Sequence, residues 1–138
     1  MLESLFNLKG RTALITGGSK GIGKAIARGF AEAGADIAIC SRHESELVKA
    51  ADEIKQGLST RVWTTVADLA KRENAEALSA WALKTCGKVD ILVNNAGSNK
   101  PQTLIDTTFD TWDEILQLNF TSCMQVARAV APGMAEAL

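Results

Sequence analysis

Short apolar segments alternate with segments of helical periodicity along the chain, and this alternation restricts the possible folds more than any other feature. Four apolar runs are predicted strands, at residues 12–16, 37–40, 62–67 and 91–93. The first three are each followed by a predicted helix that a glycine ends, at residues 21–33, 44–56 and 72–86. Such alternation is typical of βαβ units and a parallel sheet. We therefore expect residues 1–138 to form one α/β domain with a doubly wound, Rossmann-like parallel sheet.

The composition of the strands bears on their order in that sheet. Right-handed crossovers favour the order 3-2-1-4. The third strand mixes polar residues with valines, as an edge strand should. The fourth strand, Ile91-Leu92-Val93, is uniformly apolar, which is typical of a strand covered on both faces, yet this order puts it at the other edge. We interpret the mismatch as a sign that the sheet is truncated before a fifth strand.

The overall composition narrows the classes of function. Fifteen Lys and Arg oppose sixteen Asp and Glu, so the formal net charge is −1. This balance argues against nucleic acid or an anionic membrane as the partner. No apolar stretch approaches the roughly 20 residues that span a bilayer. Three cysteines without metal-ligand spacing and a single histidine predict no metal site and reduced thiols, as in a cytoplasmic protein.

A glycine-rich segment, Thr16-Gly17-Gly18-Ser19-Lys20-Gly21-Ile22-Gly23, joins the first predicted strand to the first helix. Gly17 can make the tight turn off the strand, Gly21 lets backbone approach a diphosphate, and Gly23 lets the helix pack close to the sheet. Free N–H groups from Ser19 to Ile22, at the positive end of the helix dipole, would bind the phosphates. Glycine-rich turns can also be purely structural. The strand before and the helix after favour an NAD(P)-binding domain.

The end of the second strand indicates which dinucleotide is preferred. Domains that choose NAD place an acidic residue there to bind the ribose 2′-hydroxyl, whereas this chain has Ser41-Arg42. Asp36 is acidic but precedes the strand, so it should lie far from that end. Arg42 offers a charged planar fork for a 2′-phosphate, and Lys20 could face the same group. Alternatively, Ser41 and Glu44 form a capping box and Arg42 is merely solvated. We favour NADP(H) over NAD(H).

A loop from Gly97 to about Asp106 precedes a long final helix. A capping box is predicted at Thr111-Trp112-Asp113-Glu114, and Pro132 is expected to interrupt or end the helix. An apolar stripe runs along one face, formed by Trp112, Ile115, Leu116, Cys123, Val126 and Val130. Asn119 lies on this stripe, so we expect its amide to be buried and hydrogen-bonded, because an unpaired buried amide costs about 1–3 kcal/mol.

At four places the sequence resembles the short-chain dehydrogenase/reductase family. Residues 16–23 look like its T-G-x-x-x-G-x-G signature, and Asn94-Asn95-Ala96-Gly97 looks like its N-N-A-G signature after the fourth strand. Asp68-Leu69 is similar to the family's acidic dipeptide after the third strand, and Asn119 to the asparagine of the following helix. The resemblance covers the whole chain but only about the amino-terminal half of a typical member. The domain is therefore expected to be incomplete relative to the family.

The resemblance implies a role for each of these residues. Asp68 and Leu69 would contact the adenine ring. Asn95, with Ala96 and Gly97, would lie near the cofactor's ribose. Asn119 would help to hold a water in a proton relay to a catalytic lysine, although its spacing alone fits a core asparagine bonded to main chain equally well.

Members of the family transfer a hydride between nicotinamide and a carbonyl or alcohol carbon, using a serine and a Tyr-x-x-x-Lys pair. This sequence contains no tyrosine, and the serine would lie beyond Leu138. We expect the cofactor-binding half of an NADP-dependent oxidoreductase acting on a small ketone or secondary alcohol, homo-oligomeric when complete. The alternatives are a non-catalytic NADP(H)-binding module, and an interaction fragment using the exposed sheet edge and last helix.

Overall fold

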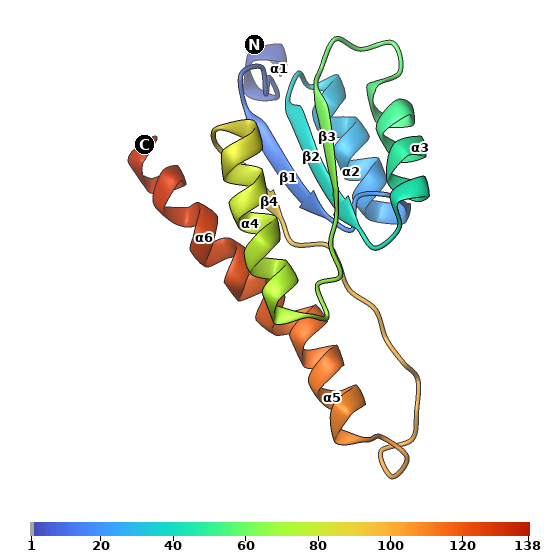
Figure 1. Cartoon of the computed structure of the whole chain (residues 1–138). Coiled ribbons are helices and arrows are strands. Elements are labelled where there is room, and N and C mark those ends of the chain that lie inside the picture. Colours follow the sequence, from blue (N-terminus) through green and yellow to red (C-terminus); the bar gives the residue numbers. More distant parts are fainter. Residues whose placement is uncertain (1) are drawn as a thin grey trace.

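The computed structural model describes residues 2–138, and its four strands and the helices between them follow one another along the chain as the sequence predicts (Figure 1). The short helix at Leu2–Leu5 and the π-helical turn in the final helix were not predicted. Four parallel strands alternate with helices. The elements are α1 (Leu2–Leu5), β1 (Thr12–Thr16), α2 (Gly21–Glu32), β2 (Asp36–Ser41), α3 (Glu44–Lys55), β3 (Val62–Val66), α4 (Arg72–Cys86), β4 (Ile91–Val93), α5 (Phe109–Leu116), a π-helical turn (Gln117–Thr121) and α6 (Ser122–Glu136).

The strand order is β3-β2-β1-β4, which confirms the predicted 3-2-1-4 arrangement. β1 pairs with β2 and β4, in a register that places Leu14 beside Ala38 on one side and Leu92 on the other. All five residues of β1 are buried, because the strand has a neighbour on each side and helices over both faces. β3 is an edge strand, as its polar residues predict, and β4 forms the other edge.

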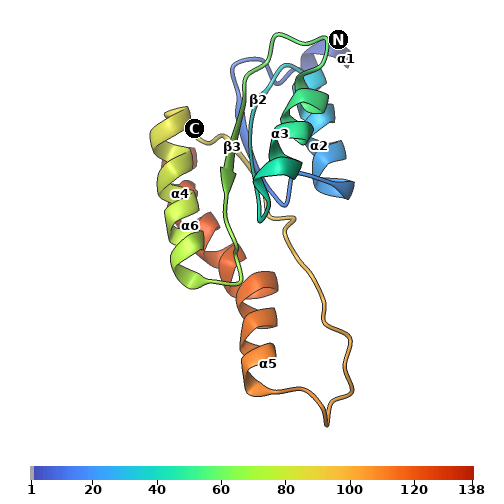
Figure 2. The same cartoon turned by 45° about the vertical axis from the view of Figure 1, so that its right-hand side comes forward.

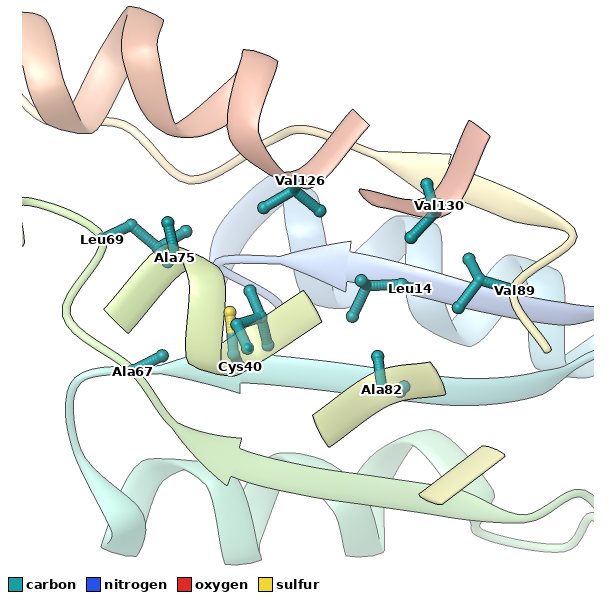
Figure 3. Close-up of a cluster of buried hydrophobic side chains, with 11 residues drawn as sticks. Leu14, Cys40, Ala67, Leu69, Ala75, Ala82, Val89, Val126 and Val130 are labelled. Atoms are coloured by element: carbon teal, nitrogen blue, oxygen red, sulfur yellow. The ribbon is translucent and has the colours of Figure 1, made fainter. Parts of the chain in front are cut away.

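Helices cover the two faces of the sheet, and a separate apolar core lies under each layer (Figures 1 and 2). Alternate residues along a strand point to opposite faces. Ile15 and Ile39 therefore pack toward α2 and α3, through residues that include Ala27, Leu47 and Ile54. Leu14 and Cys40 pack toward α4 and α6, against residues that include Ala75, Ala82, Val126 and Val130 (Figure 3). Leu92 packs against this second core and Ile91 against the first, so both faces of β4 are in contact with a core, although its three residues are only half-buried.

The final helix differs from the prediction in the residue at which it begins and in the effect of Pro132. It begins at Phe109, and Thr108 caps it by accepting a hydrogen bond from the Thr111 amide at 3.1 Å. The predicted capping box at Thr111 is therefore wrong, since Thr111 already lies in the first turn. Pro132 neither interrupts nor ends the helix, which continues to Glu136. α5 and the segment before it extend away from the sheet (Figures 1 and 2).

The π turn changes which face of this helix is buried. The turn adds a residue relative to regular α-helical geometry, so every later side chain is rotated around the axis. Val126 and Val130, which follow the turn, are buried as predicted. Trp112 and Leu116 of the predicted stripe precede it and are 52% and 42% exposed, because α5 extends away from the sheet. Asn119 is exposed, which corrects the expectation that its amide is buried.

Two further differences concern β2 and α3. Asp36 is the first residue of β2 rather than a residue before it. Ser41 is the last residue of β2, and the N-cap of α3 is His43, which no side chain in the described part of the chain caps. The Ser41 hydroxyl instead accepts from the His43 amide at 3.4 Å. The predicted capping box of Ser41 and Glu44 is wrong, because the helix begins too late for Ser41 to cap it.

Candidate functional site

A cavity of about 490 Å³ lies at the carboxyl end of the sheet, beside the turn from β1 into α2. The ends of β1, β2 and β4 and the loops after them supply its walls, as expected for ligand sites of open α/β sheets. Eleven of the predicted site residues line it: Gly17, Ser19, Lys20, Gly21, Ile22, Ser41, Arg42, Leu69, Asn95, Ala96 and Gly97. Gly23, Asp68 and Asn119 are not among its lining residues.

The glycine-rich turn is shaped by close contacts that leave no room for a side chain. A Cβ on Gly23 would lie 2.3 Å from the Gly17 carbonyl oxygen, and one on Gly17 would lie 3.0 Å from the Ala96 Cα. Gly18, which the sequence reasoning did not single out, is as restricted, because its Cβ would lie 2.4 Å from the Ile39 side chain. Gly21 has φ +58, the left-handed conformation that favours glycine. The turn is therefore a tight cradle whose inner surface is main chain.

The amino-terminal end of α2 faces this cradle without a cap. Lys20 is the N-cap, in an extended conformation, and no side chain within residues 2–138 caps it. The first amides of a helix need an external partner, and the helix dipole makes them favourable for anions. Ser19, Lys20, Gly21 and Ile22 all line the cavity. A glycine cradle with uncapped amides fits a diphosphate group.

Hydrogen bonds to Thr16 join the loop after β4 to the glycine-rich turn, a role that was not predicted from the sequence. Its hydroxyl accepts hydrogen bonds from the Asn95 and Ala96 amides at 3.0 and 2.9 Å. In return, the Asn95 side-chain amide donates to the carbonyls of Thr16 and Gly17 at 3.1 and 3.2 Å. The threonine of the T-G-x-x-x-G-x-G signature was the available signal. These bonds hold two cavity walls in one fixed relationship.

Asn119 joins a slightly later part of the same loop, at Ser98, to the final helix. Its side-chain amide donates to the carbonyls of Ser98 at 2.9 Å and Ile115 at 3.0 Å, and its Oδ1 accepts from the Ser98 amide at 3.1 Å. A Cβ on Gly97 would lie 2.7 Å from that Oδ1. The sequence predicts hydrogen-bond partners for this amide, and in the structure these partners are main-chain groups. Asn94 adds a second link, from its amide to the Cys123 carbonyl at 3.2 Å.

The cavity edge near the end of β2 is rich in charged groups. Arg42 and Lys20 are both exposed lining residues, and neither forms an ion pair within the described part of the chain. Glu46, which the sequence reasoning overlooked, also lines the cavity and accepts a hydrogen bond from the Ser19 hydroxyl at 3.4 Å. Nothing in the sequence marked Glu46, since its place depends on how α3 packs beside the turn.

Asp36 lies at the opposite end of β2 and is already paired. Its carboxylate forms an ion pair with Arg61 at 2.7 Å. Partial burial alone would raise the pKa of Asp36, but its hydrogen bonds and charge interaction with Arg61 lower that pKa below its ordinary value. Asp36 is the first residue of β2, whereas the cavity is lined by Cys40 and Ser41, the last two residues of that strand. The prediction that Asp36 lies far from the dinucleotide end is confirmed.

The loop after β3 supplies one apolar wall. Leu69 is 3% exposed and lines the cavity. The Asp68 carboxylate instead accepts from the Ala70 amide at 3.1 Å, and the Asp68 carbonyl accepts from the Asn74 side chain at 3.2 Å. Asp68 thus stabilises the loop that presents Leu69. Its own adenine contact stays a prediction.

Cys40 forms part of the cavity floor. The thiol is 1% exposed, and burial raises its pKa to about 11. A thiol with such a pKa stays protonated at neutral pH, so Cys40 behaves as a small apolar residue. Within residues 2–138 the structure contains no cluster of three or more metal-ligating side chains. None of the helices described there is both long and apolar enough to cross a membrane.

Comparison with known proteins assigns this architecture to a family. A family model described as short chain dehydrogenase matches residues 11–137. An uncharacterized oxidoreductase of Mycobacterium tuberculosis is 39% identical over 136 residues, covering 99% of this chain and 51% of that protein. An NADP-dependent mannitol dehydrogenase of Alternaria alternata is 36% identical over 132 residues, covering 94% of this chain and 50% of the relative.

Solved structures of short-chain dehydrogenases and reductases share this fold. The L-sorbose reductase of Gluconobacter frateurii, complexed with NADPH and L-sorbose, matches with a TM-score of 0.90 and 35% identity over 96% of this chain. It is covered over 50% of its own length. A 3-oxoacyl (acyl-carrier-protein) reductase of Agrobacterium tumefaciens with NADP bound matches with a TM-score of 0.91 and 31% identity, over 99% of this chain and 52% of that one. The chain spans about half the length of the relatives it matches, and it belongs to the short chain dehydrogenase family.

Proposed function

We propose that this chain binds NADP(H) in preference to NAD(H), as the cofactor-binding half of an oxidoreductase. The observation that carries the proposal is the end of β2, where Arg42 and Lys20 line the cavity edge and form no ion pair within residues 2–138. The acid of the strand, Asp36, is at its other end. A guanidinium group can donate two hydrogen bonds to a phosphate, whereas domains that bind NAD use a carboxylate to accept from the ribose 2′-hydroxyl. The related mannitol dehydrogenase is NADP-dependent, and two structural neighbours hold NADPH or NADP.

Each wall of the cavity would hold a different part of the dinucleotide. The main-chain amides of Ser19 to Ile22 would bind the diphosphate, and Ser41, Arg42 and Lys20 the 2′-phosphate. Leu69, with Asp68 behind it, would face the adenine. Asn95, Ala96 and Gly97 would pack beside the ribose toward nicotinamide. The chemistry that the cofactor would supply when bound is hydride transfer, given to a ketone carbon by the reduced form or accepted from a secondary alcohol carbon by the oxidised form.

Asn119 would act at the nicotinamide side of this reaction. It fixes the main chain of Ser98, which lines the cavity, through the paired hydrogen bonds at 2.9 and 3.1 Å. We propose that the same amide helps to order the proton path to the substrate oxygen. The 138 residues contain no tyrosine, so the tyrosine acid that the family uses is not among them. The whole protein's carbonyl or alcohol substrate would be small and bound beside Ser98.

Calorimetric titration with NADPH and NADH tests the cofactor assignment. A charge-assisted hydrogen bond contributes about 1.5–3 kcal/mol, so Arg42→Ala should weaken NADPH binding about tenfold or more. NADH affinity should stay the same, because NADH lacks the 2′-phosphate. Arg128→Ala is the matched control, since Arg128 is an exposed arginine of α6 outside the cavity. Equal NADPH affinity of the wild-type and Arg42→Ala proteins would contradict the assignment.

A further inference from the structure

Two buried glutamines of the final helix face each other across the π turn. Gln117 begins the turn and is 9% exposed, and Gln125 lies in α6 and is 6% exposed. The Gln117 Nε2 donates to the Gln125 Oε1 at 2.7 Å. Neither side chain lines the cavity, and neither belongs to the signatures that identify the family.

Both glutamines also bind main chain at the start of α4: Gln117 contacts the loop before this helix, and Gln125 contacts its first residue. The Gln117 Nε2 lies 3.5 Å from the Leu69 carbonyl oxygen, and the Gln125 Nε2 donates to the Arg72 carbonyl at 3.2 Å. Leu69 lines the cavity. The pair therefore joins the helix that carries Asn119 to the loop that forms the apolar wall. Buried amides need such partners, so each glutamine depends on this one arrangement.

The eight-residue spacing of the pair requires the π turn. In a regular α-helix each residue adds about 100° of rotation, so residues eight apart differ by about 80° and residues seven apart by about 20°. The π turn adds one residue between Gln117 and Gln125. The two side chains therefore stand nearly as residues seven apart do, on one face. If the turn became regular α-helix, Gln125 would rotate away from Gln117.

The same turn presents the functional side of the helix to the cavity. Leu118 lines the cavity, and Asn119 reaches both main-chain groups of Ser98. Return to regular geometry would rotate these side chains by about 100° relative to α6. Gly97, whose Cβ would lie 2.7 Å from the Asn119 oxygen, shows how closely the loop fits this register.

We infer that Gln117 and Gln125 are positioning residues that lock the π turn and so hold Asn119 against Ser98 and Leu118 in the cavity wall. The inference rests on the proposed function for the meaning of Asn119, but its geometric content does not require a bound cofactor. The hydrogen bond between the glutamines favours the π register, because regular α-helix would turn the two side chains about 80° apart. The Leu69 and Arg72 carbonyls set that register relative to the rest of the domain.

The double variant Gln117→Leu/Gln125→Leu tests the inference in the 138-residue chain. It removes both amides together, so no glutamine is left buried and unpaired, and the side chains keep a similar volume. NMR reports the outcome through the Asn119 side-chain amide signals and the exchange rate of the Ser98 amide proton. We expect the Asn119 signals to move to the position of a solvated amide and the Ser98 exchange to accelerate about tenfold. NADPH affinity should fall several-fold.

Ser79→Ala is the matched control. Ser79 is a buried polar residue of α4 that donates to the Ala75 carbonyl at 3.0 Å within its own helix. The Ser79→Ala substitution should lower the free energy of unfolding without changing the π turn. It should therefore leave the Asn119 and Ser98 NMR signals in place. A folded double variant with wild-type Asn119 and Ser98 signals would overturn the inference.

The wild-type chain gives a second test that needs no folded variant. On warming, the side-chain amide signals of Gln117, Gln125 and Asn119 should lose their dispersion together. If the Asn119 signals change while those of the glutamines persist, the glutamines do not hold the turn. Failure of the wild-type chain to bind NADPH would contradict the proposed function, and these amide signals would still decide the inference.

Discussion

Asn95 and Gly23 lie so close that a Cβ on Gly23 would sit 2.5 Å from the Asn95 side-chain nitrogen. That nitrogen is already committed to the carbonyls of Thr16 and Gly17. The first turn of α2, the end of β1 and the loop after β4 therefore meet at one point, and the absence of a side chain at Gly23 permits the meeting. The close contact between Gly23 and Asn95 therefore fixes the positions of the cavity walls relative to one another.

Replacing Gly23 with alanine should disrupt this meeting point. The new methyl would also lie 2.3 Å from the Gly17 carbonyl oxygen, which is main chain and has little freedom to move. Overpacking of this kind costs about 1–3 kcal/mol. We expect Gly23→Ala to lower the free energy of unfolding by that amount, measured by urea denaturation, and to weaken NADPH binding at least tenfold.

Gly29→Ala provides a control of opposite sign in the same helix. A Cβ on Gly29 would meet nothing within 4 Å. Alanine is favoured over glycine inside a helix by up to about 1 kcal/mol, so this variant should be more stable and bind NADPH normally. If Gly23→Ala were as stable and as tight-binding as Gly29→Ala, the close contact would have no consequence.

Because the Cys40 thiol is buried, we expect the protein to lose stability at alkaline pH. Burial raises the pKa of this thiol from 9.0 to about 11, so the folded protein favours the neutral form. The stabilising contribution is complete below the unfolded pKa and is lost as pH rises from about 9 toward 11. The free energy of unfolding should fall over that range by up to about 1.4 kcal/mol per pH unit. No tyrosine titrates here, since the chain has none.

The comparison variant is Cys40→Ala, whose stability should decline less steeply over the same pH range. The slope is compared rather than the absolute stability, because removing a buried sulfur also leaves a small void. Urea denaturation at several pH values between 8 and 11, in steps of about half a unit, measures both slopes. Parallel slopes would refute the proposed alkaline titration of the thiol.

Glu46 should limit the affinity for NADP. Its carboxylate lines the same cavity as Arg42 and Lys20, so its charge opposes a bound phosphate while its hydrogen bond with Ser19 steadies the turn. Glu46→Gln keeps a hydrogen-bond acceptor and removes the charge. We expect NADPH to bind several-fold more tightly, with a smaller gain for NADH, and the difference to shrink at high salt.

Glu44→Gln is the corresponding control, because Glu44 is exposed in the same helical turn but does not line the cavity. Calorimetry at low and high salt separates a local effect from the change in net charge that both variants share. An equal gain for the two variants would show that Glu46 has no special influence on the cavity.

The sequence predicts the sheet and most of the cavity because short-range patterns determine them. The bounds of α4, at Arg72 and Cys86, agree with those expected from its periodicity and from Gly87. The strand order follows from the handedness of crossovers, which depends little on individual residues. The glycine signature likewise identifies the cradle, since tight main-chain contacts tolerate only glycine at Gly23.

The differences arise where tertiary contacts override a local pattern. A regular helical period puts Asn119 in the core, whereas Asn119 is exposed within the π turn. The single residue that this turn adds to the helix leaves no trace in the composition. Ser41 has the right spacing for a cap, yet the pairing of β2 with β3 extends the strand through it. Glu46 and Gln125 gain their importance from neighbours in other elements, which no local pattern reveals.

The central claim is that the amides at the start of α2 bind the diphosphate of a dinucleotide. Amide NMR spectra of the 138-residue chain, recorded while NADPH is added, test it most directly. Saturable shifts should be largest for Ser19, Lys20, Gly21 and Ile22, with smaller shifts at Arg42 and Asn95. A folded chain whose spectrum does not change with NADPH, or changes only away from this turn, would contradict the claim.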